Sequence, residues 1–142
     1  MSIRSLRSLA GSQEPVLYYP AEATVSEVAR GMRARNVSAA MVVEGTRLQG
    51  IFTERDALVR VIAADRDPRR TPVGEVMTRD PQCIHPDRPF VDALRMMHDG
   101  RFRHVPIVED GHPLGMVSVR DALHSDFTDL VDVIGTREMA RE

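Results

Sequence analysis

The sequence predicts an α/β protein of the α+β type, in which two copies of a β-α-β-β-α unit pack about an internal pseudo-two-fold axis. The first observation is a repeated string: "GIFTERDAL" begins at Gly50, and "GMVSVRDAL" begins at Gly115. The second is that the same offset of 65 aligns residues 24–58 with 89–123 without a gap, with nine identical positions. The third is that apolar periodicity repeats at this offset even where the letters differ. These observations indicate an internal duplication.

Each unit is expected to contain a short strand, an amphipathic helix, two strands that form a hairpin, and a closing helix. In the first unit the expected positions are 16–19, 25–35, 39–43, 48–53 and a helix from residue 54. In the second they are 82–84, 90–99, 104–108, 114–118 and a helix from residue 119. Apolar residues at i, i+3, i+4 and i+7 predict the amphipathic helices: Val25, Val28, Ala29 and Met32, then Phe90, Ala93, Leu94 and Met97. The first closing helix is expected to bury a stripe of Ala57, Leu58, Val61 and Ile62.

The chain is accordingly divided into five segments. They are an N-terminal helical segment at 1–13, the first repeat at 14–67, a linker with a short helix at 68–80, the second repeat at 81–126, and a C-terminal helix or tail at 127–142. One repeat alone buries too little surface to be comfortably stable. The apolar faces of the two sheets are therefore expected to pack against each other.

The segments outside the repeats each carry an apolar stripe. The N-terminal segment has Arg and Ser without acids, as transit peptides do, but the spacing of Ile3, Leu6 and Leu9 favours a short helix. In the linker, Thr71 is expected to cap a helix that starts at Pro72 and has an apolar side of Val73, Val76 and Met77. Residues 127–134 predict one more amphipathic helix, which packs either on a second protomer or back on its own module.

Composition excludes several classes of protein. Hydrophobic residues make up 42% and charged residues 28%, with a net charge of −2, so the chain lacks the basic excess of a general nucleic-acid-binding protein. No apolar run approaches the roughly 20 residues that cross a bilayer. Cys83 is the single cysteine, which excludes an intramolecular disulfide and suits a reducing cytoplasm. We expect a cytoplasmic protein that binds neither nucleic acid nor membrane.

Two strand-to-helix junctions carry the same polar pattern, Thr53 with Asp56 and Ser118 with Asp121. One interpretation is structural, because a hydroxyl followed three residues later by an acid forms a capping box worth about 1 kcal/mol. The other is functional. A helix start preceded by glycine offers unpaired N–H groups to a phosphate, and a carboxylate accepts hydrogen bonds from both hydroxyls of a ribose. Both interpretations can hold together, since a ligand can displace a cap.

Four strings extend this pattern into a resemblance to a known family. With the two repeated strings, "TPVGEVMTRDP" between them and "RFRHVPIVEDG" before the second, residues 14–125 resemble a tandem pair of CBS (cystathionine-β-synthase-type) domains, a Bateman module. The resemblance implies binding of adenosine-containing ligands such as AMP, ATP or NAD in clefts between the repeats. It also implies that two modules pair into a flat homodimer.

The resemblance implies a role for each matching residue. Asp56 and Asp121 contact ribose, Thr53 and Ser118 contact the first phosphate, and the strand near Val105 and Pro106 meets the adenine edge. Basic residues beside these positions balance the phosphate charge: Arg55, Arg103, His104 and Arg120.

The second repeat has more basic residues just before its hairpin than the first repeat has. Arg101, Arg103 and His104 precede its strand, whereas Asn36, Ser38 and Ala39 stand at the matching positions of the first repeat. Two unequal sites are therefore expected, one of them better suited to phosphate, although Arg101 and Arg103 could equally form a solvated rim. The sequence alone leaves open which Asp accompanies Arg103 and His104.

Catalytic and metal motifs are missing from the sequence, so we expect no enzyme activity. There is no P-loop, GxGxxG or HExxH string. Cys83 falls in an expected strand, where a buried inert thiol is favoured. The five histidines at 85, 98, 104, 112 and 124 lack the spacing of metal ligands.

The sequence thus predicts a non-catalytic adenine-nucleotide sensor that forms a homodimer and signals to an effector protein by tightening the cleft between its repeats. Two alternatives remain at this point. One is a ligand-free structural or dimerisation module whose Thr/Ser–Asp pairs only cap helices. The weaker one is a small nucleotide-processing enzyme.

Overall fold

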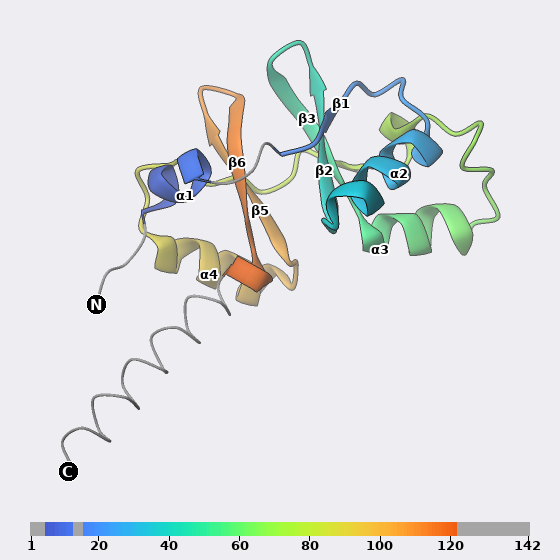
Figure 1. Ribbon diagram of the computed structural model, residues 1–142. Coiled ribbons are helices and arrows are strands. Elements are labelled where there is room, and N and C mark those ends of the chain that lie inside the picture. The colour runs from blue at the N-terminus through green and yellow to red at the C-terminus, as the bar shows by residue number, and fades with distance from the viewer. Residues whose placement is uncertain (1–4, 13–15, 122–142) are drawn as a thin grey trace, which may run out of the picture.

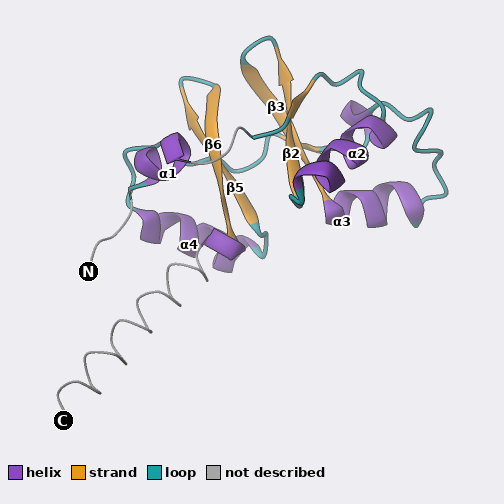
Figure 2. Ribbon diagram, viewed as in Figure 1, coloured by secondary structure: helices purple, strands orange, loops and turns teal. Residues whose placement is uncertain are grey.

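The computed structural model describes residues 5–12 and 16–121. Two β-hairpins stand side by side in the middle of the molecule, and helices lie on the outer flank of each (Figures 1 and 2). Helices α2 and α3 flank the hairpin of the first unit, and α1 and α4 flank that of the second (Figure 1). No helix among the described residues has the length and apolar character needed to cross a membrane.

The first unit forms a four-stranded sheet in the order β1-β2-β3-β4. Its elements are β1 (Tyr18–Tyr19), α2 (Val25–Arg35), β2 (Ala39–Glu44), β3 (Arg47–Thr53), α3 (Glu54–Asp56) with a π-helical continuation Ala57–Ile62, and β4 (Thr78–Arg79). A 3-10 turn, Val73–Glu75, precedes β4. The second unit comprises α4 (Phe90–Gly100), β5 (His104–Glu109) and β6 (His112–Ser118), and helical conformation resumes at 119–121. Helix α1 (Leu6–Ser12) packs against β6 and β5.

The duplication is visible in the strand register. Ala39 pairs with Thr53 in one hairpin, and His104 pairs with Ser118 in the other, at the same offset of 65. Each hairpin has a register shift at the equivalent place, between Val42 and Val43 and between Ile107 and Val108. The two predicted hairpins and amphipathic helices are confirmed, because matched apolar patterns and matched registers arise from the same repeat.

Each unit is completed by the segment that precedes the other unit. The linker residues Val73, Val76 and Met77 are buried with the core of the first unit. Leu6 and Leu9 of α1 are buried with the core of the second. This reciprocal packing explains why neither unit is a self-contained domain.

A third cluster joins the two sheets. It contains the buried side chains of Ala39, Met41, Ile51 and Met116. The first three come from β2 and β3, and Met116 comes from β6, so the two hairpins bury apolar faces against each other. The predicted face-to-face packing of the halves is therefore confirmed.

Three local expectations were wrong. The first strand of each unit is shorter than predicted: β1 covers only Tyr18–Tyr19, and residues 82–84 contribute a single parallel bridge from Ile84 to Ile107. Thr71 does not cap the linker helix, because its hydroxyl donates to the carbonyl of Asp67 at 2.7 Å and Pro72 precedes the 3-10 turn.

The third error concerns the closing helix of the first unit. Val61 is 2% exposed and Ala57 packs against the core, but Leu58 and Ile62 are 58% and 68% exposed. The segment is a π-helix in which Val61 is buried and Leu58 and Ile62 face outward. Ile3, the helix at 127–134 and the rest of the second closing helix lie outside the described residues.

Candidate functional site: two cavities between the repeats

The first predicted corner, Thr53 with Asp56, is a complete capping box. The backbone N–H and the hydroxyl of Thr53 donate to Oδ2 of Asp56 at 3.0 and 3.2 Å. The N–H of Asp56 donates back to Oγ1 of Thr53 at 3.2 Å. The structural interpretation of this pair is thus confirmed, and it holds both polar groups at the end of β3.

The linker strand also contacts this corner. The hydroxyl of Thr78 in β4 donates to Oδ1 of Asp56 at 3.1 Å, and Nε of Arg60 lies 3.6 Å from the same oxygen. These contacts leave Asp56 only 7% exposed. Gly50 permits the approach of β4, because a Cβ at this position would stand 2.5 Å from the carbonyl oxygen of Thr78. The first acid is therefore fixed from two sides.

The second corner, Ser118 with Asp121, has the same capping box but fewer additional contacts among the described residues. The N–H and hydroxyl of Ser118 donate to Oδ2 of Asp121 at 2.9 and 3.0 Å. The N–H of Asp121 donates to Oγ of Ser118 at 3.2 Å. Asp121 is half-buried, and no linker strand comparable to β4 reaches it within the part of the chain that the structure describes.

Two cavities open beside these corners. Cavity A has a volume of about 680 Å³, and cavity B has a volume of about 820 Å³. Cavity A is lined by Val16, Leu17, Arg35, Asn36, Val37, Ser38, Ala39, Glu54, His104, Met116, Ser118, Arg120 and Asp121. Cavity B is lined by Ser38, Ile51, Thr53, Glu54, Arg55, Asp56, Val59, Arg60, Thr78, Asp80, Pro81, Gln82, Arg101, Phe102, Arg103 and His104.

The two cavities are related by the internal repeat, and each draws residues from both units. Cavity B combines the Thr53–Asp56 corner of the first unit with Arg103 and His104 of the second. Cavity A combines the Ser118–Asp121 corner with residues 36–39 of the first unit. The question that the sequence left open is answered for Arg103, which shares cavity B with Asp56, whereas His104 lines both cavities.

Left-handed residues turn the chain into each cavity. Asn36 ends α2 at φ 53°, and Arg101 ends α4 at φ 55°. These positions correspond at the offset of 65, and each lines one cavity. A non-glycine residue in this conformation is uncommon, and Asn tolerates it better than Arg does. The helix ends therefore place an amide in cavity A and a guanidinium in cavity B.

The two cavities differ in charge. Four arginines line cavity B (Arg55, Arg60, Arg101 and Arg103), together with the acids Glu54, Asp56 and Asp80. Arg35 and Arg120 line cavity A, with Glu54 and Asp121. Arg55 and Arg120, the predicted basic neighbours, thus occupy matching positions. The expected inequality of the two sites follows from positions 101 and 103, which are basic only in the second unit.

His104 forms part of the wall between the cavities. Its Nε2 lies 2.8 Å from the hydroxyl oxygen of Ser38, and both residues line both cavities. Burial is the main cause that lowers the pKa of His104 below its usual value. Glu54 and Asp121 act against this shift, whereas Arg103 adds to it.

Two of the proposed binding residues do not line either cavity. Val105 is fully buried within β5, and Pro106 is fully buried beside it. The carbonyl of Pro106 accepts a hydrogen bond from the N–H of Ile84 at 2.9 Å. Their side chains are buried, whereas the predicted adenine contact involves the backbone of this strand and stays a prediction.

Sequence reasoning missed several lining residues. Ser38 was noted only as a position without a basic group, and Glu54 and Thr78 were given no binding role. The offset of 65 could have identified Ser38, because it corresponds to Arg103. Thr78 had no such signal, since only the return of the linker to β3 places it beside Asp56.

Cys83 is not buried as expected. It is an exposed residue, and its thiol donates to the carbonyl of Pro81 at 3.1 Å. Partial burial and the charge of Asp80 raise the pKa of the thiol, which favours the unreactive protonated form. Low reactivity of the Cys83 thiol stays a prediction.

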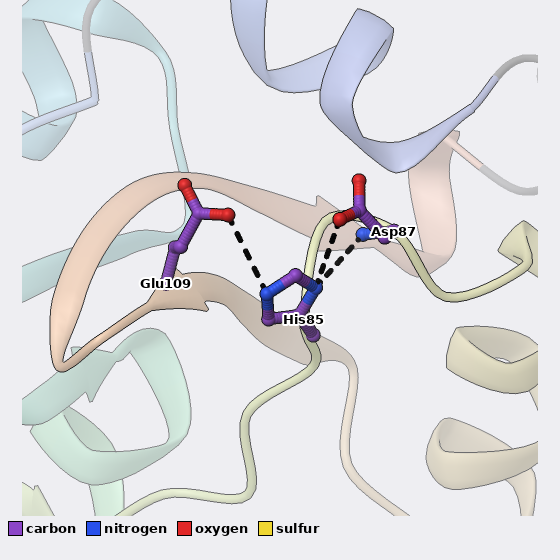
Figure 3. A group of neighbouring side chains, drawn as sticks. All are labelled: His85, Asp87 and Glu109. Carbon is purple, nitrogen blue, oxygen red and sulfur yellow. Dashed lines mark hydrogen bonds and ion pairs between the residues drawn. The ribbon is translucent and has the colours of Figure 1, made fainter.

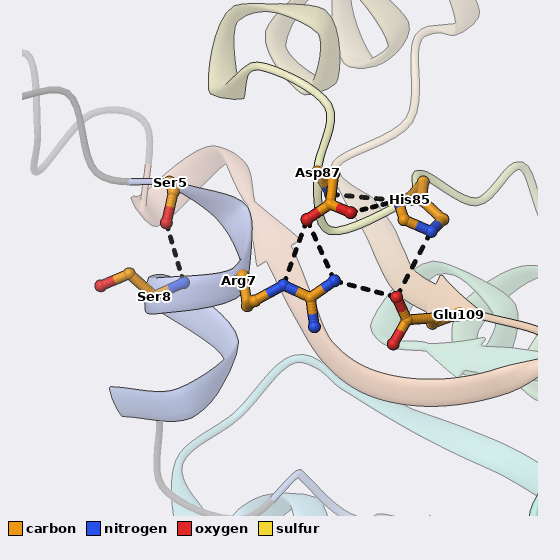
Figure 4. Close-up of polar contacts among 6 residues, drawn as sticks. All are labelled: Ser5, Arg7, Ser8, His85, Asp87 and Glu109. Atoms are coloured by element: carbon orange, nitrogen blue, oxygen red, sulfur yellow. Dashed lines mark hydrogen bonds and ion pairs between the residues drawn. The ribbon is translucent and has the colours of Figure 1, made fainter.

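His85 belongs to a cluster of potential metal-ligating side chains that the spacing of the histidines in the sequence did not predict. His85, Asp87 and Glu109 bring their ligand-type atoms within 4.8 Å of one another (Figure 3). Arg7 already joins the two acids, with Nη2 at 3.0 Å from Asp87 and 2.9 Å from Glu109 (Figure 4). Ser5 caps the same helix by accepting the N–H of Ser8 at 3.0 Å (Figure 4). The cluster thus ties α1 to the second unit through an exposed ion-pair network.

The family follows from comparison with known proteins. The family model of the CBS domain matches the chain twice, over residues 6–63 and 73–127, and the chain therefore belongs to the CBS-domain family. It is 38% identical over 102 residues to the CBS domain-containing protein CBSCBSPB3 of Arabidopsis thaliana, a match that covers 71% of this chain and 18% of that protein. The chain thus spans about a fifth of the length of that relative.

Solved structures show the same fold. A CBS-domain protein from Burkholderia ambifaria MC40-6 matches with a TM-score of 0.81 at 24% identity, over 89% of this chain and 96% of that one. The CBS domain protein PAE2072 from Pyrobaculum aerophilum, complexed with AMP, matches with a TM-score of 0.74 at 25% identity, over 83% and 89% of the two chains.

Proposed function

We propose that this protein is a non-catalytic regulatory module that binds adenine nucleotides of the AMP, ATP or NAD type in cavities A and B. The observation that carries this proposal is the pair of repeat-related cavities, each with a hydroxyl–carboxylate corner and arginine in its wall. The AMP complex of PAE2072 supports the choice of adenine nucleotides. A volume of several hundred Å³ suits a ligand of this size.

Cavity B is the better candidate for a ligand with several phosphates. Arg55, Arg101 and Arg103 line it, and a guanidinium binds phosphate oxygens with two parallel hydrogen bonds. Asp56 would accept the ribose hydroxyls, although its oxygens already accept hydrogen bonds from Thr53 and Thr78. Ligand binding in cavity B therefore competes with the cap, which lowers the net affinity.

Cavity A is the better candidate for a monophosphate. It has fewer arginines, and the Ser118–Asp121 corner has fewer internal partners among the described residues. Among the described residues, the carboxylate of Asp121 accepts fewer hydrogen bonds than that of Asp56 and is therefore more available to a ribose. We expect AMP to prefer this cavity.

Calorimetric titration with AMP, ATP and NAD tests the binding proposal. Wild-type protein is expected to release or absorb heat with at least one nucleotide, and Asp121→Ala is expected to weaken AMP binding at least tenfold. Saturating ligand should also raise the melting temperature, because it binds only the folded state. No heat and no thermal shift with all three nucleotides would reject the proposal. Chromatography of ATP or NAD incubated with the protein, with no new product, is expected for a non-catalytic module.

A second function, assembly, is favoured by an exposed apolar face on the π-helix. Leu58, Val59 and Ile62 are 58%, 52% and 68% exposed and lie on one short segment. A contiguous apolar face of this kind marks an interaction surface. We propose that it contributes to a homodimer, which would present the cavities to an effector protein.

Light scattering after size exclusion tests the dimer. Ile62→Glu is expected to give a monomer, because it places a charge in the apolar contact. Val91→Glu is a matched control, since Val91 is 48% exposed on α4, away from the π-helix. A wild-type protein that is monomeric at all concentrations, or an Ile62→Glu variant that remains dimeric, would contradict this surface.

A further inference from the structure

One hydrogen bond crosses between the two repeats at the wall that the cavities share. Ser38 lies between α2 and β2, and His104 is the first residue of β5. The Ser38 hydroxyl oxygen and Nε2 of His104 are 2.8 Å apart, and both side chains are partly buried. At the offset of 65, Ser38 corresponds to Arg103 and His104 to Ala39, so the contact is not duplicated elsewhere by the repeat.

We propose that the Ser38–His104 pair couples the two cavities, so that an anion bound in one raises the affinity of the other for a second anion. This inference rests on the proposed function, because it concerns the regulation of the same two sites. It adds a physical connection between them. Among the described residues, only Ser38, Glu54 and His104 line both cavities.

The coupling operates through the proton of His104. Burial lowers the pKa of the imidazole, which favours its neutral form. Glu54 on α3 and Asp121 after β6 favour the protonated form, and Arg103 before β5 opposes it. A phosphate in either cavity adds a negative charge to this balance and favours the imidazolium. The second phosphate then interacts with a His104 imidazolium whose protonation the first phosphate has already favoured.

Ser38 keeps the imidazole on the shared wall. A hydroxyl can donate to an unprotonated ring nitrogen and can accept from a protonated one, so the contact survives in both charge states. Without this partner the ring is free to turn toward one cavity. Ser38 is therefore a positioning residue, and His104 is the group that carries the charge.

The inference requires a restricted pH range. Well below the pKa of the empty protein, His104 is already protonated and the first anion gains no additional charge. Far above the pKa of the ligand-bound protein, the ring stays neutral throughout. Coupling is largest between these two values, and there it is expected to be about fivefold to tenfold, which lies in the usual range for linked sites.

Calorimetry with AMP as the probe tests the coupling in full-length protein. Titrations are performed between pH 5 and 8.5 in pairs of buffers with different ionisation enthalpies. Near neutral pH, wild type is expected to take up more protons per AMP than His104→Asn and to bind the second AMP more tightly than the first. His104→Asn is expected to bind two AMP independently. Ser38→Ala should retain proton uptake while it loses most of the coupling.

Several results would overturn the inference. They are equal proton uptake by wild type and His104→Asn, independent binding by wild type at every pH, or unchanged coupling in Ser38→Ala.

A separate measurement distinguishes this inference from the proposed function. If no nucleotide binds, the proposed function fails, and the imidazole of His104 is then titrated by NMR with and without inorganic phosphate. A raised His104 pKa in phosphate, with a smaller rise in Ser38→Ala, would uphold the shared anion-sensitive wall. A His104 pKa that phosphate leaves unchanged would reject it. Because this titration uses the wild type, it does not depend on the folding of His104→Asn.

Discussion

The hydroxyl of Thr78 lies 3.1 Å from Oδ1 of Asp56, so the strand that connects the two repeats is hydrogen-bonded to the proposed ribose-binding acid. The equivalent acid, Asp121, has its cap from Ser118 but no such support from a linker strand within residues 5–12 and 16–121. The two corners are thus alike in local geometry and unlike in tertiary context. Substitution of Asp56 and substitution of Asp121 are therefore expected to have different effects on stability.

Replacement of the two acids is expected to give unequal losses of stability. Asp121→Ala removes one capping box and should cost about 1 kcal/mol. Asp56→Ala also leaves the partly buried Thr78 hydroxyl without its partner, and should cost about 2–3 kcal/mol. Urea denaturation of the ligand-free proteins measures both. Equal losses would show that the Thr78 contact contributes nothing.

Gly50→Ala is expected to destabilise the protein by about 1–3 kcal/mol, because the new methyl group overlaps the backbone of β4. Its Cβ would stand 2.5 Å from the Thr78 carbonyl oxygen, which is main chain and cannot simply rotate away. Gly11→Ala is the matched control, since nothing lies within 4 Å of its added Cβ and the residue is in α1. The control should be neutral or stabilising by up to about 1 kcal/mol. Thermal and urea unfolding compare the two variants.

The stability of the ligand-free protein is expected to fall on acidification in part because of His104. Its folded pKa lies below the unfolded value, so the unfolded state binds the proton more tightly. The contribution is fully present above the unfolded pKa of about 6.5, and it is lost as the pH falls through the folded pKa. His104→Asn should therefore show a flatter pH dependence of the free energy of unfolding between pH 7.5 and 5. Parallel curves for wild type and His104→Asn would contradict this assignment.

Helix α1 is expected to be held by apolar burial rather than by its ion pairs. Leu6 is fully buried in the core of the second unit, and Leu6→Ala should cost about 2–5 kcal/mol. Arg7 pairs with Asp87 and Glu109 at the exposed surface, where such pairs contribute little and are screened by salt. Arg7→Ala should leave the urea midpoint nearly unchanged at physiological salt. A loss as large as that of Leu6→Ala would show that the network fixes the helix.

The unequal charge of the cavities predicts a ligand-specific effect. Arg103→Gln should weaken ATP more than AMP, because Arg103 lines cavity B, where several phosphates are proposed to bind. Arg88→Gln is a suitable control, since Arg88 is exposed, pairs with Asp92 on α4 and lines neither cavity. Calorimetric dissociation constants for both nucleotides measure the difference. Equal weakening of ATP and AMP by Arg103→Gln would contradict the assignment.

Much of the fold could be predicted from the sequence, because its patterns are local. The helices at 25–35 and 90–100 and both hairpins follow from apolar periodicity and from the repeated strings. The Thr53–Asp56 and Ser118–Asp121 corners were predicted for the same reason, since a capping box is completed within four residues. Leu58 and Ile62 were wrongly expected to be buried, because apolar character alone does not show which side of a helix the rest of the fold covers.

The sequence by itself determined the duplication, the elements of each repeat and the polar corners, because these depend on residues that are close together in the chain. Only the tertiary structure decided that Asp56 shares a cavity with Arg103, that Thr78 supports it, and that Ser38 meets His104. Those relationships join segments more than 20 residues apart. They arise when two hairpins bury their apolar faces together, and no local pattern in the chain specifies which polar groups then become neighbours.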